Sequence, residues 1–171
     1  MSLHGFEPII AKHPRLLILG SMPSVTSLEK QEYYGYRHNR FWPMMAEYFH
    51  VDLPDYEAKK RCIRDHDIIL WDVIGSCDRI GSLDSAIRNE VCNDIPELLK
   101  KYPEISLILC NGKKSFTLFE RMMANQTAVE YVYCPSTSNA NRTMKEADLF
   151  AHWFAQLDRI YQDEGFRGGK G

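Results

Sequence analysis

A run of aromatic, cationic and amide side chains between residues 31 and 42 has the clearest chemical potential in the sequence. It reads Gln-Glu-Tyr-Tyr-Gly-Tyr-Arg-His-Asn-Arg-Phe-Trp. Aromatic faces can hold a flat heterocycle by stacking, which is worth about 1–3 kcal/mol per nucleobase. The planar fork of an arginine side chain matches phosphate oxygens. The run could therefore hold a nucleobase and grip its backbone; an aromatic loop folded against the core, with its charges in water, is the alternative.

Four short apolar runs are expected to form buried β-strands, because each ends in a glycine or a polar turn. They are residues 15–20, 67–73, 105–110 and 129–133. Stretches with apolar residues at helical spacing separate them, and no hairpin turn joins one run to the next. Right-handed crossovers between the strands then give a parallel sheet covered by helices on both faces. The sequence predicts an α/β fold.

Local signals mark where several of these helices begin. Asp55 is a candidate N-cap for a helix that ends near Arg64. The segment 93–96, Asn-Asp-Ile-Pro, places a proline in the first turn of another. Thr143 and Glu146 have the spacing of a capping box ahead of a long amphipathic helix that reaches residue 161.

The carboxyl ends of all four predicted strands open into polar or glycine-containing turns. These turns are residues 21–24, 72–76, 111–114 and 135–141. In open parallel sheets, ligands bind outside the carboxyl ends of the strands. We therefore expect the four turns to face one shared cleft, close to the aromatic run.

Composition narrows the class of protein. The 171 residues are expected to form a single domain, 1–171, with a frayed tail at 165–171. The net charge of −2 gives no overall attraction for nucleic acid, so any such binding needs a local basic patch. The five cysteines are widely spaced, which argues against disulfides, a metal site or an iron-sulfur cluster. With no leader or membrane-spanning segment in the sequence, a cytoplasmic protein is expected.

Five motifs occur along the chain in a fixed order on this strand pattern. They are Gly-Ser-Met-Pro-Ser, Tyr-Tyr-Gly-Tyr-Arg-His-Asn-Arg-Phe-Trp, Leu-Trp-Asp-Val-Ile-Gly-Ser-Cys, Cys-Asn-Gly-Lys-Lys and Pro-Ser-Thr-Ser-Asn-Ala-Asn-Arg. Together they resemble the uracil-DNA glycosylase superfamily, and more closely its hypoxanthine-DNA (DNA-deoxyinosine) glycosylase branch. The resemblance covers the chain from about Leu16 to Tyr161.

This resemblance implies a three-layer α/β/α fold around a short four-stranded parallel sheet. It also implies a DNA glycosylase, which removes deaminated bases by hydrolysing the N-glycosidic bond during base excision repair. No cofactor is expected, and base-flipping enzymes of this size work as monomers. Because no lysine lies in a recognisable nucleophile motif, a monofunctional enzyme without a Schiff-base lyase step is expected.

The resemblance also assigns the residues that do the chemistry. The turn after the first strand holds the catalytic motif in relatives, and the matching residues here are Gly20, Ser21, Met22, Pro23 and Ser24. Met22 stands where many relatives carry Asp or Asn, and methionine cannot position water. The catalytic amide of the hypoxanthine branch corresponds to Asn39, which is expected to hold a water molecule by accepting its hydrogen bond. The alternative for Asn39 is a helix cap before residues 41–43.

Further residues are expected to bind the extruded base. Tyr34 corresponds to the aromatic residue that stacks on it. Asp72 could accept the N1 hydrogen of hypoxanthine or the N3 hydrogen of uracil, although aspartate is also common in turns. His38 could orient the substrate. The expected substrate-binding residues are Gly20, Ser21, Met22, Pro23, Tyr34, His38, Asp72 and Asn111.

The loop 135–142 resembles the segment that enters the duplex when a base is extruded. The hydroxyls of Ser136 and Ser138 could bind phosphate, and Asn139 or Arg142 could fill the vacated stack. Cations beside the predicted cleft would provide the local basic patch. The expected DNA-binding residues are Arg37, Arg40, Lys113, Lys114, Ser136, Ser138, Asn139 and Arg142.

Three alternatives stay open at the level of sequence. The first is a glycosylase for uracil, including uracil in G·U mismatches, because uracil and hypoxanthine share a ring amide. The second is a catalytically silent nucleic-acid-binding module, which Met22 and the lack of a strong base would also suit. The third, an enzyme acting on small nucleotides, lacks support because the chain has no Gly-x-Gly-x-x-Gly or phosphate-loop motif.

Overall fold

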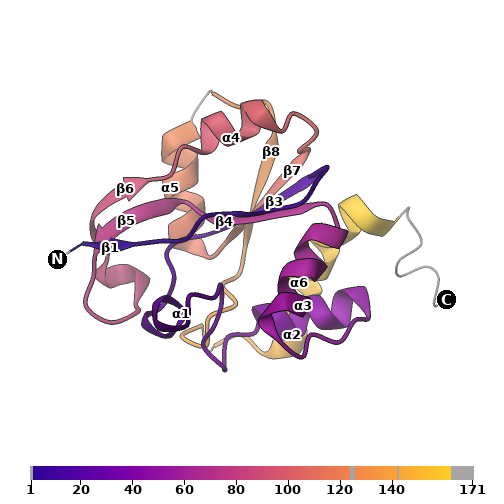
Figure 1. Cartoon of the computed structure of the whole chain (residues 1–171), viewed down its shortest axis with the longest axis horizontal. Helices are drawn as coiled ribbons and strands as arrows, with labels where there is room; N and C mark the ends of the chain where they lie inside the picture. Colours follow the sequence, from indigo (N-terminus) through magenta and orange to yellow (C-terminus); the bar gives the residue numbers. More distant parts are fainter. Residues whose placement is uncertain (1, 124–125, 142, 163–171) are drawn as a thin grey trace.

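The computed structural model describes residues 2–123, 126–141 and 143–162. The tail predicted to fray, 165–171, lies outside these residues. The described elements appear in Figure 1. Its strands are β1 (Leu3–His4), β2 (Ile9–Ile10), β3 (Leu16–Gly20), β4 (Ile68–Asp72), β5 (Ile74–Asp78), β6 (Arg88–Cys92), β7 (Leu107–Asn111) and β8 (Glu130–Cys134). Its helices are α1 (Val25–Lys30), α2 (Phe41–Phe49), α3 (Tyr56–Asp65), the 3-10 turn η1 (Asp84–Ala86), α4 (Ile95–Lys101), α5 (Lys113–Met123) and α6 (Glu146–Tyr161).

The four apolar runs predicted as strands are β3, β4, β7 and β8. They are hydrogen-bonded in the order β4-β3-β7-β8, and each neighbouring pair is parallel. The short strand β2 adds a fifth, antiparallel member beside β4. The predicted parallel sheet is therefore confirmed, with one edge strand more than the sequence indicated.

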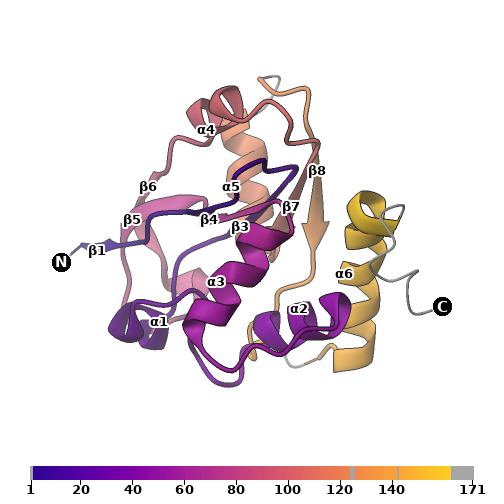
Figure 2. The ribbon, with the colours of Figure 1, turned by 45° about the vertical axis from the view of Figure 1, so that its right-hand side comes forward.

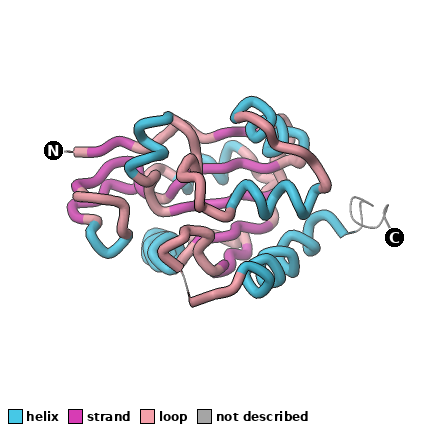
Figure 3. Tube along the Cα trace, turned by 90° about the horizontal axis from the view of Figure 1, so that it is seen from below, coloured by secondary structure: helices cyan, strands magenta, loops and turns pink. Residues whose placement is uncertain are grey.

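Alternate residues of the central strands supply two separate cores, because successive side chains of a strand point to opposite faces. Leu16 and Ile18 of β3 pack in a cluster with α2, α3 and α6. Leu17 and Leu19 pack in a second cluster with α4 and α5. Figure 2 shows these two helix groups on opposite sides of the sheet, and in Figure 3 the strands run through the middle with helices on both sides. The three-layer α/β/α class is confirmed.

A second sheet was not predicted. It consists of β1, β5 and β6, all antiparallel, in the order β1-β5-β6. The single residue Val73 separates β5 from the end of β4. The connection between β5 and β6, which contains η1, is thereby carried back toward the carboxyl end of the main sheet.

Local capping signals had mixed outcomes. The carboxylate of Asp55 accepts a 2.8 Å hydrogen bond from the Ala58 N–H at the start of α3, as expected. Pro96 lies in the first turn of α4, which is also as expected. The capping box of Thr143 and Glu146 was wrong. The N-cap residue of α6 is Lys145, and no side chain caps the helix.

The strand register aligns three polar or small residues at one edge of the sheet. Gly20 at the end of β3 is paired with Asp72 at the end of β4. On the other side of β3, Leu19 is paired with Cys110, the residue before Asn111. Asp72, Gly20 and Asn111 thus end three neighbouring strands side by side, and this row forms the base of the site described next.

Candidate active site

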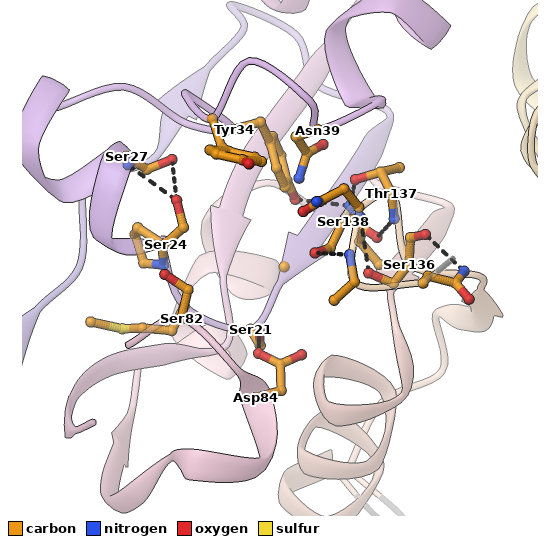
Figure 4. A pocket seen from close by; sticks show the side chains of 18 of the residues that line it. Ser21, Ser24, Ser27, Tyr34, Asn39, Ser82, Asp84, Ser136, Thr137 and Ser138 are labelled. Carbon is orange, nitrogen blue, oxygen red and sulfur yellow. Dashed lines mark hydrogen bonds between the residues drawn. The ribbon is translucent and has the colours of Figure 1, made fainter. Parts of the chain in front are cut away.

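A cavity of about 660 Å³ lies at the carboxyl edge of the sheet, a volume in the usual range for small-molecule sites. The carboxyl ends of all four parallel strands, or the turns that follow them, contribute to it, so the predicted shared cleft is confirmed. Figure 4 shows side chains that line it from several sides. Of the predicted site residues, those that line it are Gly20, Ser21, Met22, Pro23, Tyr34, Asn39, Asp72, Asn111, Lys113, Ser136, Ser138 and Asn139.

Tyr34 presents an aromatic ring to this cavity. Its backbone has φ of 52°, in the left-handed region that a tyrosine rarely adopts. One face of the ring stacks on Phe41, with ring centroids 4.3 Å apart and planes inclined by 27°. Because Phe41 is fully buried in the core beside α6, this stacking fixes the ring in place. The same ring lines the cavity.

Asn111 is held by protein partners on both sides of its amide group. Its nitrogen donates to the Tyr34 hydroxyl at 3.2 Å and to Thr137 Oγ1 at 3.0 Å. Its oxygen accepts the backbone N–H of Thr137 at 3.0 Å. The side chain therefore links the aromatic run to the loop after β8. This arrangement makes Asn111 a positioning residue, and a direct contact with DNA or base stays a prediction.

Asn39 occupies a helix start and the cavity wall at once. Its Oδ1 accepts the backbone N–H of Phe41, the first residue of α2, at 2.9 Å. A backbone N–H requires an acceptor, so this bond decides which way round the amide lies. Figure 4 shows the amide nitrogen of Asn39 directed into the cavity. The helix thus engages one lone pair of the amide oxygen, and the amide nitrogen is the group directed into the cavity. The expected role of Asn39 in holding a water molecule stays a prediction.

Asp72 lies at the deep end of the cavity and is 4% exposed. Burial raises its pKa to about 7; the negative charge of Asp84 adds to the shift, and Arg79 opposes it. Its Oδ2 is buried with no hydrogen-bond partner among the described residues. A Cβ on Gly20 would lie 2.5 Å from Asp72 Oδ1 and 2.8 Å from the Tyr34 hydroxyl. Glycine at position 20 is what allows both oxygens to approach the strand end.

Asp84 lies beside the turn after β3, a contact that the sequence did not predict. The hydroxyl of Ser21 donates to Asp84 Oδ1 at 2.7 Å, and Asp84 lines the same cavity. Met22 is 7% exposed and belongs to the core cluster beside α4 and α5. The carboxylate next to this turn therefore comes from η1, 63 positions along the chain from Ser21.

The loop after β8 folds through its own serine hydroxyls. Ser136 Oγ accepts the Ser138 N–H at 3.1 Å, and Ser138 Oγ accepts the Ala140 N–H at 3.2 Å. Each hydroxyl is used as an acceptor, so its own hydrogen is free to donate to a ligand. Both residues line the cavity with Asn139. The geometry suits donation to phosphate oxygens.

Arg40 has a role that the sequence did not predict. Its Nη1 donates to the Met144 carbonyl, and its Nη2 donates to the carbonyls of Ser138 and Asn141, each at 3.0 Å. The guanidinium thereby braces the loop after β8 against the start of α2. A direct contact between Arg40 and DNA phosphate stays a prediction.

Several other predicted residues lie away from the cavity lining. Arg37 and His38 are exposed, and the Arg37 Nε donates to the His38 ring at 3.1 Å. Lys114 is in the first turn of α5 next to the lining residue Lys113. Arg142 lies outside the described residues. Roles for these side chains in binding DNA or substrate stay predictions.

Neither a metal centre nor a membrane-spanning helix occurs in the described part of the chain. In the described ranges, no cluster of three or more His, Cys, Asp or Glu side chains is arranged to hold a metal ion. None of the described helices combines the length and apolar character needed to cross a lipid bilayer.

Comparison with known proteins agrees with the geometry. Residues 7–158 match the family model described as the uracil DNA glycosylase superfamily. A "Hypoxanthine DNA glycosylase" of Methanosarcina acetivorans is 38% identical over 146 residues, which cover 83% of this chain and 90% of the relative. One with the same name from Methanosarcina barkeri is 34% identical over the same share of each chain.

A solved structure gives the same result for the fold. The solution NMR structure of a Methanosarcina acetivorans protein described as a uracil DNA glycosylase superposes with a TM-score of 0.81 at 33% sequence identity. The similarity covers 94% of this chain and 99% of that one. The chain belongs to the uracil DNA glycosylase superfamily.

Proposed function

We propose that the protein is a monofunctional DNA glycosylase that excises hypoxanthine from deoxyinosine in DNA. The observation that carries the proposal is the meeting of three groups in one cavity: the Tyr34 ring, the Asn39 amide and the Asp72 carboxyl group. The two relatives named hypoxanthine DNA glycosylase, with more than a third of their matched residues identical to this chain, support the choice of base.

The deep end of the cavity suits a flat base. Tyr34 offers its free face for stacking, because Phe41 covers the other. Asp72 has a pKa of about 7, so it can be protonated at neutral pH. A protonated carboxyl group accepts a ring N–H through its carbonyl oxygen and donates its O–H to a ring carbonyl at the same time. Hypoxanthine presents both groups side by side, as N1–H and O6. The pair of contacts would hold its lactam edge.

Asn39 would act on the departing base. Breaking the glycosidic bond leaves positive charge on the sugar and negative charge on the base, so donors fixed in advance near the base lower the barrier. The Asn39 nitrogen faces the cavity, and the bond from Phe41 N–H to its oxygen prevents the amide from turning over. In this proposal Asn39 is a catalytic residue that donates to the base as charge develops.

The loop after β8 would hold the DNA strand beside the cavity mouth. The free hydroxyl hydrogens of Ser136 and Ser138 and the ammonium group of Lys113 would bind phosphate, and Asn139 would enter the space left by the extruded base. Arg40 would keep the loop in shape through its three carbonyl contacts. Extrusion costs a few kcal/mol, and least at a mispaired base, which favours damaged sites.

The test uses end-labelled duplexes that carry one deoxyinosine, deoxyuridine or deoxyxanthosine, with excess enzyme and alkali treatment to cut abasic sites. The proposal expects cleavage of the deoxyinosine duplex only after alkali, and no adduct on borohydride treatment. Faster cleavage at uracil would favour the alternative uracil or G·U mismatch glycosylase. Binding to the duplexes without release of any base would favour a silent binding module.

A cytoplasmic location and action as a monomer belong to the same proposal. All five cysteines are free thiols, which suits a reducing compartment. The residues that line the cavity form it within one chain, which is consistent with a monomer. Light scattering on the active protein would test the oligomeric state: a mass near 19.9 kDa agrees, and a stable larger assembly disagrees.

A further inference from the structure

The side of the cavity opposite Asn39 is formed by the connection between β5 and β6. Its residues Ser82, Leu83, Asp84 and Ser85 line the cavity. Figure 4 shows Asp84 across the cavity from Asn39, with its carboxylate turned inward beside Ser21. The proposed function assigns no role to these four residues.

Two hydrogen bonds fasten the segment to the first-strand turn and the helix after it. Asp84 Oδ1 accepts the Ser21 hydroxyl at 2.7 Å, and Ser82 Oγ accepts the Val25 N–H of α1 at 2.8 Å. Just beyond η1, Ile87 is 3% exposed and packs in the core cluster beside α4 and α5. The position of the Asp84 carboxylate is therefore fixed, although the segment around it is largely exposed.

One oxygen of the Asp84 carboxylate is available to a ligand. Ser21 binds Oδ1, and Oδ2 has no hydrogen-bond partner within the described part of the chain. Asp84 is partly exposed, whereas Asp72 is 4% exposed at the deep end. An extruded nucleotide stays attached to the DNA through its sugar, so the sugar lies nearer the mouth than the base does. Of the two acidic residues that line the cavity, Asp84 is the more exposed and therefore the one nearer the sugar.

The hydrolysis leaves two chemical tasks that Asn39 cannot perform. A side-chain amide is too weak a base to take a proton from water, and it has no charge to offset a cationic sugar. A carboxylate can do both. Asp72 is committed to the base edge in the proposed function, and its pKa of about 7 leaves it partly protonated at neutral pH.

We propose that Asp84 is a second catalytic residue, which stabilises the cationic sugar and accepts a proton from the attacking water. In this step the bond between C1′ and N9 breaks with its electron pair on the base, and the water oxygen forms the new bond to C1′. One water proton passes to Asp84, the released base takes up a proton from solvent, and Asp84 then returns its proton to solvent. The products are an abasic sugar and free hypoxanthine. This inference rests on the proposed function.

The competing explanation is that Asp84 only braces Ser21. Four variants separate the two. Asp84→Asn keeps an oxygen for the Ser21 hydroxyl but loses the charge, Asp84→Ala loses both, and Ser21→Ala loses the brace but keeps the carboxylate. Asp78→Asn is the matched control, because it removes a charge from the last residue of β5, next to the same connection. Asp78 accepts a hydrogen bond from Asn89 and does not line the cavity.

The readout is the single-turnover rate of hypoxanthine excision, with duplex affinity measured separately. A catalytic carboxylate predicts that Asp84→Asn and Asp84→Ala both lose about 100-fold or more in rate, while duplex affinity is kept. Ser21→Ala should lose much less, and Asp78→Asn should match wild type. Added formate should restore part of the rate to Asp84→Ala, because a small carboxylate can enter the vacated space, and should not help Asp84→Asn.

Two outcomes would overturn the inference while leaving the proposed function standing. One is an Asp84→Asn enzyme as fast as wild type. The other is equal loss in Ser21→Ala and Asp84→Ala with no rescue by formate, which is the pattern of a brace. If wild-type protein itself releases no base, the proposed function fails first.

Discussion

Asn39 Oδ1 and the backbone nitrogen of Phe41 are 2.9 Å apart, so one side chain both starts helix α2 and turns its amide nitrogen into the cavity. The N-cap residue of α2 is Arg40, so Asn39 is not itself the N-cap; it binds the N–H of the first helical residue from one position further out. This bond is compatible with a catalytic role for the amide, which stays a prediction. The bond to the helix is what orients the donor that the proposed chemistry uses.

Exchanging Asn39 for aspartate should separate these two roles. Asn39→Asp keeps an acceptor for the Phe41 N–H, so its melting temperature should stay near that of wild type. It replaces the N–H donor in the cavity with an oxygen, so single-turnover excision should fall about 100-fold or more. Asn39→Ala should lose activity and also about 1 kcal/mol of stability.

Asp55→Ala is the matched control for lost capping, because Asp55 caps α3 through the Ala58 N–H and does not line the cavity. It should lose a similar amount of stability and keep full activity. An Asn39→Asp enzyme with wild-type excision would rule out the donor role.

The buried carboxyl group of Asp72 predicts a particular dependence of stability on pH. Its pKa rises from 3.8 in its ordinary state to about 7 in the folded protein, chiefly through burial. Between these values the folded state binds more protons than the unfolded state, so the free energy of unfolding falls as pH increases. Asp72→Asn lacks this titration. The melting temperature of Asp72→Asn minus that of wild type should therefore grow from about pH 4 to pH 7 and stay constant above.

The contrary result is a difference in melting temperature that is the same at every pH in that range. It would show that Asp72 ionises in the folded state much as it does in the unfolded chain. Excision by Asp72→Asn should persist, because an amide can still pair with the base N1–H through its oxygen and with O6 through its nitrogen.

Gly20 is predicted to be irreplaceable for binding the base. Gly20→Ala places a Cβ within 2.8 Å of both the Asp72 carboxylate and the Tyr34 hydroxyl, so these oxygens must move. Hypoxanthine excision should be lost under conditions where circular dichroism still reports a folded protein. Adding Tyr34→Phe removes one of the two clashing oxygens and should recover part of the lost stability. Full activity in Gly20→Ala would contradict the close approach of these groups.

Arg40 and Lys113 should affect DNA binding in different ways. Arg40→Lys keeps the charge but cannot reach three carbonyls at once, so the loop after β8 should loosen and affinity should fall with the salt dependence unchanged. Lys113→Gln removes a cation at the cavity edge, so the slope of log affinity against log salt should become shallower by about one unit. A shallower slope in Arg40→Lys as well would indicate a direct phosphate contact.

The main sheet was predictable because its strands carry their own signal. The strands Leu16–Gly20 and Leu107–Asn111 are buried along their whole length and apolar up to their last residue, since helices cover both of their faces. The second sheet gave no such signal. Strand β1 has two residues, and β6 has mostly exposed side chains with a reading of Arg-Asn-Glu-Val-Cys. Residues of β1 and β6 are strands because they pair with β5, and their local composition does not encode this pairing.

The site was predictable where a residue lies at a strand end or in a family motif, as Asp72 and Asn111 do. Asp84 escaped because its importance depends on meeting Ser21 across 63 positions of chain, and an Asp after Gly-Ser-Leu looks like any turn residue. The contacts of Arg40 with the loop after β8 were not predicted for the same reason. In the sequence alone, an arginine that binds distant carbonyls cannot be told from a surface arginine.

The most direct test of the whole account is to quantify free hypoxanthine and abasic strand after one turnover on a deoxyinosine duplex, by chromatography with mass detection. We expect wild type to release one hypoxanthine per abasic strand formed, and both products to be nearly absent for Asn39→Asp. Duplex that binds tightly but yields no free base, or equal yields from the two proteins, would contradict it.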